Sequence, residues 1–177
     1  MSGSGQDHRG MKEKPIENCY WVVPDKILAG EYPGHQEEAK AQERIQALSD
    51  FGVKVFIDLT DEFQQRTPYA GFLNDVLHQW FPIKDVSVPE SKAYTQSILD
   101  AIDGHIDQGR LVYIHCWGGI GRTGLIVGCW LSRHGYPKEE ALSRLRELWS
   151  NCPKSEKNSS PETREQEDYI LNWKEEN

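Results

Sequence analysis

Two short apolar segments, 53–59 and 111–114, constrain the fold of this chain more than any other feature of its sequence. Both are rich in β-branched residues and mostly apolar, as expected of strands that are buried on both faces. The segments before them, 35–50 and 91–108, carry apolar residues at helical spacing, and a glycine follows each as a stop signal. Helices that alternate with buried strands are typical of an α/β fold. We therefore predict a mostly parallel central sheet flanked by helices.

The remaining segments add a hairpin, one further strand and several helices. Residues 20–23 and 26–32 flank a Pro-Asp turn, which predicts the hairpin. Pro82 limits the segment 80–83 to an edge strand or a strand end. The other expected elements are one helix near the end of 60–78, and helices at 124–134, from Pro137 to about 149, and from Pro161 to about 175.

The length and the charge of the chain bear on its domain organisation and its ligands. With 177 residues, the chain is expected to form one domain over 18–177, while residues 1–17 are expected to be a flexible tail or a leader added for expression. The formal net charge is −8. This charge argues against nonspecific nucleic-acid binding and against a membrane-surface role, because both need a basic face. An anionic ligand would have to bind despite the net negative charge of the chain.

Cysteine usage and hydropathy narrow the cellular setting. The four cysteines have irregular spacing and no Cys-x-x-Cys pair, which favours neither a disulfide framework nor a zinc site. No apolar run approaches the roughly 18 residues of a membrane span, and no heptad pattern suggests self-association. These features predict a cytoplasmic monomer without a metal or a cofactor.

A glycine-rich segment follows the strand 111–114 and precedes the helix 124–134. It reads His-Cys-Trp-Gly-Gly-Ile-Gly-Arg-Thr over 115–123. The three glycines allow the backbone to curl with its N–H groups turned inward as an anion nest, and the helix N-terminus adds partial positive charge. The planar guanidinium of Arg122 can bind two phosphate oxygens at once. We therefore predict a phosphate site formed by Trp117, Gly118, Gly119, Ile120, Gly121 and Arg122.

Cys116 lies at the start of this loop, six residues before Arg122. A free thiol has a pKa of about 8.5, and helix N-termini and nearby cations lower it. Cys116 is thus expected to be a thiolate at the floor of the phosphate site, placed for attack on phosphorus. The alternative is a strand-end cysteine beside glycines that only make a turn. The coincidence of Cys, three Gly, Arg and Thr at one strand-to-helix junction argues against it.

With these residues the chain resembles the cysteine-dependent protein phosphatases, the tyrosine and dual-specificity class whose signature is His-Cys-x5-Arg-Ser/Thr. The match at 115–123 is complete, and the likeness to a compact single-domain member extends over about 20–173. The resemblance implies that Cys116 forms a phosphocysteine and that Arg122 stabilises the transition state. It further implies a hydrogen bond from Thr123 to the thiolate, and a supporting role for His115 behind the loop.

The same chemistry needs a proton donor, because a phenolate or an alkoxide is a poor leaving group. Dual-specificity members keep this aspartate on a Pro-containing loop about thirty residues upstream of the cysteine, which implies Asp85. Lys84 precedes it, where the tyrosine-specific enzymes have Trp-Pro-Asp. Asp58 and Asp61, at the end of an earlier strand, remain the other candidates.

Hydrolysis of the phosphocysteine needs a positioned water, and in some branches of the family a glutamine after the signature provides it. The segment 160–166, Ser-Pro-Glu-Thr-Arg-Glu-Gln, looks like the short bacterial-type variants of that region. Gln166 is the residue that this likeness implies. The alternative for Gln166 is a polar residue on a solvated helix face.

The resemblance predicts a phosphomonoesterase for phosphotyrosine proteins, with phosphoserine and phosphothreonine proteins as further substrates. A second hypothesis is an inositol phosphate or phosphoinositide phosphatase. Members of that kind often carry basic residues at the loop positions that Trp117 and Ile120 occupy here. A third hypothesis is a catalytically weak phosphate-binding module, against which the intact Cys116 and Arg122 argue.

Overall fold

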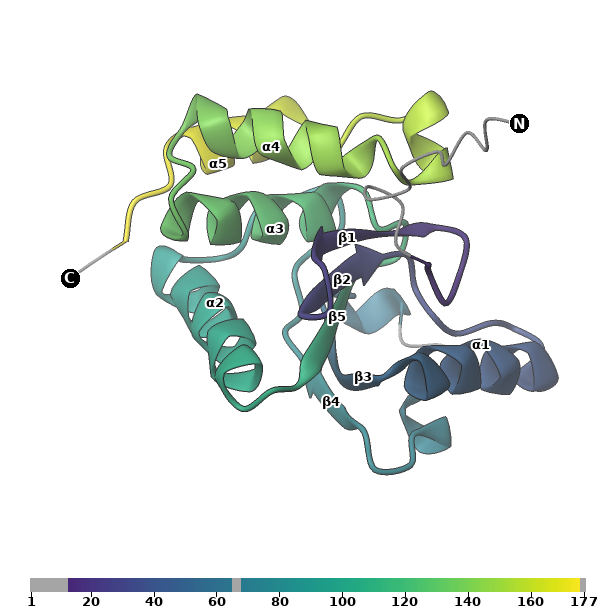
Figure 1. Ribbon diagram of the computed structural model, residues 1–177. Helices are drawn as coiled ribbons and strands as arrows, with labels where there is room; N and C mark the ends of the chain where they lie inside the picture. Colours follow the sequence, from purple (N-terminus) through teal and green to yellow (C-terminus); the bar gives the residue numbers. More distant parts are fainter. Residues whose placement is uncertain (1–12, 65–67, 176–177) are drawn as a thin grey trace, which may run out of the picture.

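The central sheet has five strands in the order β1-β2-β5-β3-β4 (Figure 1). β1 (Cys19–Val23) and β2 (Ile27–Gly30) form the predicted antiparallel hairpin. β2 pairs in parallel with β5 (Leu111–His115), which pairs in parallel with β3 (Val53–Asp58). β3 in turn pairs in parallel with β4 (Leu77–Trp80) at the edge of the sheet. The prediction of a mostly parallel sheet in an α/β fold is confirmed.

This computed structural model describes residues 13–64 and 68–175. Of the tail expected over 1–17, the first twelve residues lie outside the described part of the chain. The end of that segment is attached to the domain, since Lys14 Nζ donates a hydrogen bond of 3.0 Å to the Asn151 carbonyl.

The strands divide the apolar core into two parts, because successive side chains of a strand point to opposite faces of the sheet. In β3, Val55 and Ile57 belong to one buried cluster and Phe56 to the other. In β5, Ile114 and Tyr113 divide in the same way. Both central strands are therefore buried on both faces, as their apolar sequences predict.

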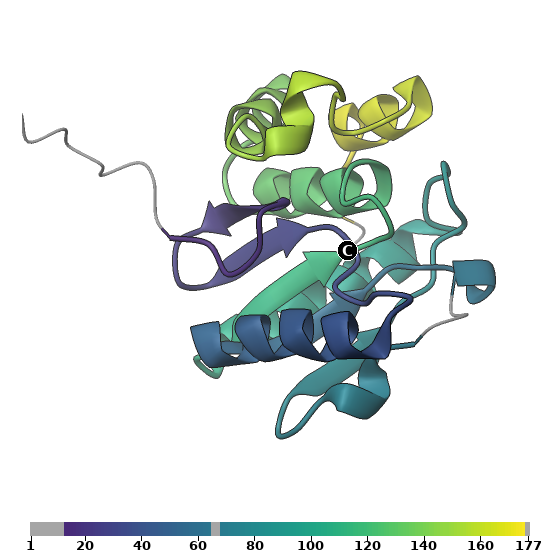
Figure 2. The same cartoon turned by 90° about the vertical axis from the view of Figure 1, so that its right-hand side faces the viewer.

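Helices cover both faces of the sheet, as Figures 1 and 2 show. α1 (Glu38–Phe51) packs on one face and ends at Gly52, which has a positive φ of 119°. α2 (Lys92–Asp107) and α3 (Gly121–Arg133) pack on the other face. α4 (Glu139–Trp149) and α5 (Arg164–Leu171) lie against α3 on its far side (Figure 2).

Four helices differ by two or more residues from the predicted boundaries, and α1 is one of them, since it begins at Glu38 and not at 35. α3 begins at Gly121, not at 124, because its first turn is polar and escapes the apolar pattern. α4 begins at Glu139 and not at Pro137. α5 begins at Arg164, not at Pro161, because Thr163 and Gln166 form a capping box there, and it ends at Leu171.

Two predictions between β3 and α2 were wrong. The helix expected near the end of 60–78 is a short 3-10 turn, η2 (Ala70–Phe72), and a second such turn, η1 (Glu62–Gln64), follows β3. The strand expected at 80–83 is β4, which ends at Trp80. Its residues are partly exposed at the sheet edge, so they lack the apolar pattern that marks the central strands.

Candidate active site

The segment 116–120 connects β5 to α3 and forms the predicted loop at the carboxyl end of the sheet. Cys116 is only 2% exposed, and its Sγ accepts a hydrogen bond of 3.3 Å from the Gly119 amide. The loop thus directs a backbone N–H towards the sulfur, as an anion-binding nest does.

Gly119 is the position at which this loop requires glycine. Its φ of 75° lies in the left-handed region, and an added Cβ would lie 2.4 Å from the carbonyl carbon of Gly30 in β2. Gly118 differs, because the nearest atom to an added Cβ there is in the Ile120 side chain at 3.5 Å. The close approach of β2 and the loop therefore depends on Gly119.

Hydrogen bonds from outside the loop hold several of its carbonyls. The Tyr32 amide donates to the Trp117 carbonyl at 3.0 Å. Lys154 Nζ donates to the Gly118 carbonyl at 2.9 Å, and the Ser160 hydroxyl donates to the Ile120 carbonyl at 2.6 Å. These bonds from outside the loop fix the direction of its peptide groups around Cys116.

His115 supports the loop from behind, as expected. Its Nδ1 donates to the Cys116 carbonyl at 3.0 Å, so Nε2 is left to accept the hydrogen bond of 2.5 Å from the Tyr69 hydroxyl. Burial lowers the pKa of His115, and burial raises the pKa of Tyr69. A neutral imidazole and a protonated phenol fit this arrangement. Tyr69 is a site residue that the sequence did not indicate.

Asp58, one of the alternative proton donors, has its carboxylate engaged in hydrogen bonds inside the protein. It is fully buried, and it accepts hydrogen bonds from the Thr60 hydroxyl at 2.6 Å and from His78 Nε2 at 2.9 Å. Burial favours the neutral acid, but His115, His78 and Thr60 together hold the pKa of Asp58 below its usual value. Asp58 is therefore a buried carboxylate and not a proton donor at the mouth of the site.

Arg122 lies in the first turn of α3 and is 2% exposed. Its Nη1 donates to the Ile83 carbonyl at 3.0 Å and to Gln64 Oε1 at 2.8 Å. Its Nη2 lies 3.0 Å from Asp85 Oδ1 in an ion pair. The structure thus brings Arg122 and Asp85, which are far apart in the sequence, into direct contact.

Asp85 has a half-exposed side chain on the loop after β4. Its Oδ1 also accepts the Val86 amide at 2.9 Å. Its own amide donates to Asp61 Oδ2 at 3.2 Å. Asp61, the other alternative donor, therefore holds the backbone of the loop that carries Asp85.

Thr123 and Gln166 are both buried, and Thr123 does not make the contact expected of it. The Thr123 hydroxyl has no hydrogen-bond partner within the described residues, so the bond to Cys116 is not formed. Gln166 Oε1 accepts the Thr163 amide at 3.1 Å, and its Nε2 donates to the Ser87 carbonyl at 3.0 Å. The alternative of a solvated face was wrong for Gln166, which connects α5 to the Asp85 loop.

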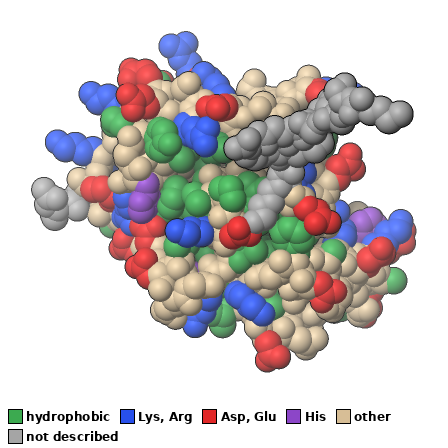
Figure 3. All heavy atoms as spheres, in the orientation of Figure 1, with side chains coloured by type: hydrophobic (Ala, Val, Ile, Leu, Met, Phe, Trp, Pro, Cys, Tyr) green, Lys and Arg blue, Asp and Glu red, His purple; other side chains and the backbone are tan. Residues whose placement is uncertain are grey.

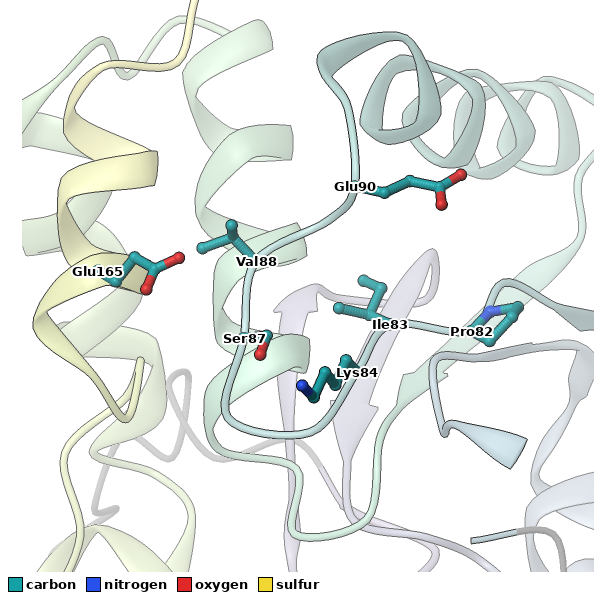
Figure 4. A pocket seen from close by; sticks show the side chains of 7 residues that line it. All are labelled: Pro82, Ile83, Lys84, Ser87, Val88, Glu90 and Glu165. Carbon is teal, nitrogen blue, oxygen red and sulfur yellow. The ribbon is translucent and has the colours of Figure 1, made fainter. Parts of the chain in front are cut away.

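A depression of about 350 Å³ lies along the Asp85 loop, between that loop and the start of α5 (Figure 4). Its lining residues are Pro82, Ile83, Lys84, Ser87, Val88, Glu90 and Glu165. Two of them also contact the site, since the Ile83 carbonyl accepts from Arg122 and the Ser87 carbonyl accepts from Gln166. The Asp85 loop therefore contacts Arg122 and also lines this depression.

Within residues 13–64 and 68–175, no three His, Cys, Asp or Glu side chains are grouped so that they could hold a metal ion. In that same part of the chain, no helix has the length and apolar character to cross a membrane.

The sequence model of a phosphatase family matches this chain over residues 31–136. This range includes the loop, Asp85 and the first turn of α3. The family is described as "Polymorphic toxin system, DSP-PTPase phosphatase". The chain belongs to this family. Among curated proteins, "Putative tyrosine phosphatase 067L" of Invertebrate iridescent virus 3 is 32% identical over 122 residues, which are 66% of this chain and 47% of that protein. The chain spans about half the length of the curated relatives it matches.

Solved phosphatase structures share the fold of this phosphatase. The kinase-associated phosphatase with its catalytic cysteine replaced by serine superposes with a TM-score of 0.70 at 20% identity, over 90% of this chain and 94% of that one. The TpbA protein of P. aeruginosa, in complex with phosphotyrosine, superposes with a TM-score of 0.66 at 18% identity, over 92% of this chain and 88% of that one. The predicted family and the predicted fold are both confirmed.

Proposed function

We propose that this phosphatase hydrolyses phosphotyrosine in proteins, and also phosphoserine and phosphothreonine, through a phosphocysteine on Cys116. One observation carries the proposal: Cys116 at the start of the loop and Arg122 in the first turn of α3 flank the same turn of backbone, and Arg122 Nη2 is in direct contact with Asp85 at 3.0 Å. The nucleophile, the phosphate-binding cation and the proton donor are thus all supplied at one edge of the sheet.

The first half of the reaction transfers the phosphoryl group to the enzyme. The Cys116 thiolate attacks phosphorus, a sulfur–phosphorus bond forms, and the bond from phosphorus to the substrate oxygen breaks. Protonated Asp85 gives its proton to that leaving oxygen. Arg122 and the loop amides stabilise the charge on the remaining phosphoryl oxygens. For this step Arg122 must exchange the Asp85 carboxylate for phosphate.

The second half releases phosphate and restores the thiolate. A water molecule attacks phosphorus, and the Asp85 carboxylate takes its proton, while the sulfur–phosphorus bond breaks. For Gln166 to place this water, its amide would have to exchange a bond that it makes to the Thr163 amide or to the Ser87 carbonyl. His115 and Tyr69 act through the loop backbone and do not transfer protons.

Two observations support a phosphotyrosine substrate. The half-exposed Trp117 ring stacks on Tyr32 with ring centroids 4.7 Å apart, which places a fixed aromatic surface directly after Cys116. The curated viral relative is named a tyrosine phosphatase, and the P. aeruginosa protein was solved with phosphotyrosine. Neither Trp117 nor Ile120 adds positive charge, which argues against a phosphoinositide substrate.

A substrate panel tests the proposal. Phosphotyrosine, phosphoserine and phosphothreonine peptides and phosphoinositide vesicles are incubated with the wild type and with Cys116→Ser, and released phosphate is measured. We expect turnover of the phosphotyrosine peptide that Cys116→Ser abolishes. Turnover of the vesicles alone would instead assign a lipid phosphatase, and phosphate binding without turnover would assign a binding module. Substantial activity of Cys116→Ser would refute the phosphocysteine.

A further inference from the structure

Gln64 contacts both of the charged residues that the proposed reaction uses, yet it has no part in the chemistry described above. It lies in η1, the 3-10 turn that follows β3. Its Oε1 accepts a hydrogen bond of 2.8 Å from Arg122 Nη1, and its Nε2 donates a long hydrogen bond of 3.4 Å to Asp85 Oδ2. Together with the ion pair between Arg122 and Asp85, these bonds close a triangle of three side chains.

A side-chain amide is suited to this place because it carries an acceptor and a donor on the same carbon. The oxygen can bind a guanidinium while the nitrogen binds a carboxylate. A carboxylate at position 64 would bind Arg122 but repel Asp85. An apolar side chain would remove the Gln64 acceptor from Arg122 Nη1 and the donor to Asp85, and would so break the link between the two charged groups.

We propose that Gln64 is a positioning residue that keeps Arg122 and Asp85 in place while Arg122 exchanges Asp85 for phosphate. This inference rests on the proposed function of the same site. The exchange occurs at Nη2, whereas Gln64 binds Nη1, so its hydrogen bond to Arg122 does not have to break. Its bond to Asp85 keeps the carboxyl group beside the site after Arg122 has turned to the substrate.

Other partners fix part of this arrangement. The carbonyls of Leu59 and Ile83 also accept hydrogen bonds from Arg122 Nη1, at 3.3 and 3.0 Å. Asp61 holds the Asp85 amide through Oδ2, and its own amide donates to Gln64 Oε1 at 3.2 Å. These contacts fix the backbone of the two segments and the depth of the guanidinium. Only Gln64 joins the two functional side chains through an uncharged group within the described residues.

Two substitutions test whether Gln64 positions Arg122 and Asp85 or only contributes to the stability of its own turn. Gln64→Met keeps the size of the side chain but removes all its hydrogen bonds. Gln64→Glu keeps the acceptor for Arg122 and for the Asp61 amide, but it removes the donor to Asp85 and adds a negative charge. Gln46→Met is the matched control, because Gln46 lies on the exposed side of α1 and its amide donates to Asp50 Oδ1 at 2.7 Å, on the same helix.

Three quantities are measured for each protein: kcat and KM for a phosphotyrosine peptide, whose leaving group needs the proton donor, across a pH range, the affinity for tungstate by calorimetry, and the unfolding midpoint. For Gln64→Met we expect kcat to fall about tenfold and tungstate to bind about tenfold more weakly, with the midpoint close to that of the control. For Gln64→Glu we expect the alkaline decline of kcat to move to higher pH by about one unit. The added charge faces Asp85, beside Asp61 and Arg122, and favours the protonated acid.

The possible results distinguish a failure of this inference from a failure of the proposed function. Wild-type kcat, pH profile and tungstate affinity in both Gln64 variants would overturn the role of Gln64 while the phosphatase activity stands. If the wild type itself does not hydrolyse the substrate, the proposed function fails, and the tungstate affinity alone decides the role of Gln64. An unchanged pH profile in Gln64→Glu would overturn the contact with Asp85.

Discussion

Gly119 shows how a single residue determines whether the phosphate loop can form. In Gly119→Ala the new Cβ would meet the Gly30 carbonyl, and the left-handed backbone would cost a further roughly 1–2 kcal/mol. We expect tungstate affinity to fall at least tenfold, measured by calorimetry. Gly118→Ala, where the nearest side-chain atom is 3.5 Å away, should bind tungstate almost as the wild type does. Equal affinities in the two variants would contradict this description of the loop.

Asp85 and Asp61 lie on neighbouring loops, but only Asp85 contacts Arg122. Asp85→Asn should lower kcat for a phosphotyrosine peptide about 10²- to 10⁴-fold with little change in KM, because only proton transfer is lost. Asp61→Asn should have a much smaller effect, since its carboxylate binds the Asp85 amide and not the substrate. Steady-state kinetics measures both. A large loss of kcat in Asp61→Asn with normal kcat in Asp85→Asn would show that the proton donor is misassigned.

At the scale of elements, the sequence predicted what apolar burial determines. β3 and β5 were predicted because both of their faces are buried, and α2 because its apolar stripe is regular. The start of α3 and the extent of β4 were missed. The first turn of α3 faces the site with polar residues, and β4 lies at the exposed edge, so neither follows the apolar pattern.

The loop between β5 and α3 was predictable because its chemistry is contiguous in the sequence. Asp85 was placed by its loop and by resemblance, and the structure brings it to Arg122. Tyr69, Gln64 and Lys154 were not predicted, because each reaches the site only through tertiary contact from a segment without a distinctive pattern. Gln166 was assigned to the correct neighbourhood, but burial and capping of α5 occupy its side chain.

The carboxyl ends of β3 and β5 carry a pair of buried groups that should make stability depend on pH. Burial lowers the pKa of His115 below its usual value of about 6.5, so the unfolded chain binds a proton there before the folded one does. The neutral His115 therefore stabilises the folded state above about pH 6.5, and this contribution to the free energy of unfolding is lost as the pH falls below that value. Asp58, whose pKa is also held low, loses its contribution only below about pH 4.

Urea denaturation from pH 7.5 to pH 5 tests this dependence. His115→Gln should be less stable than the wild type at pH 7.5, because the Tyr69 and Cys116 contacts change. The difference between the two proteins should shrink as the pH falls to 5. His35→Gln is the control, since His35 is an exposed side chain ahead of α1 that accepts from the Glu37 amide at 2.9 Å. A difference that stays constant or widens for His115→Gln would contradict a neutral buried His115.

At the scale of the whole molecule, the charge of −8 and the binding of an anion are reconciled locally. Acidic and basic side chains are interspersed over the face shown in Figure 3, with no large area of one sign. Near the loop, Lys154 and Arg44 both pair with the one carboxylate of Glu31, at 2.8 and 3.1 Å, so most of their charge is compensated there. Phosphate attraction therefore falls to Arg122, the loop amides and the helix end.

This distribution predicts a salt effect that depends on the substrate. Raising NaCl from about 50 to about 200 mM shortens the distance over which the electrostatic potential of the net negative charge acts. KM should fall for a phosphotyrosine peptide with acidic flanks, because its repulsion is screened, and rise for one with basic flanks. Initial-rate kinetics at the two salt concentrations measures the change. The same direction of change for both peptides would show that the global charge does not steer the substrate.

The covalent step on Cys116 is tested most directly by trapping the phosphoenzyme. Asp85→Asn is mixed with p-nitrophenyl phosphate, whose leaving group needs little acid assistance, and the reaction is quenched in acid within seconds. Loss of the Asp85 base should slow hydrolysis, so the intermediate should accumulate. We predict one phosphoryl group on the peptide that contains Cys116, detected by mass spectrometry and absent from the double variant with Cys116→Ser. Continued turnover with no phosphorylated cysteine, or with phosphate on another residue, would contradict the mechanism.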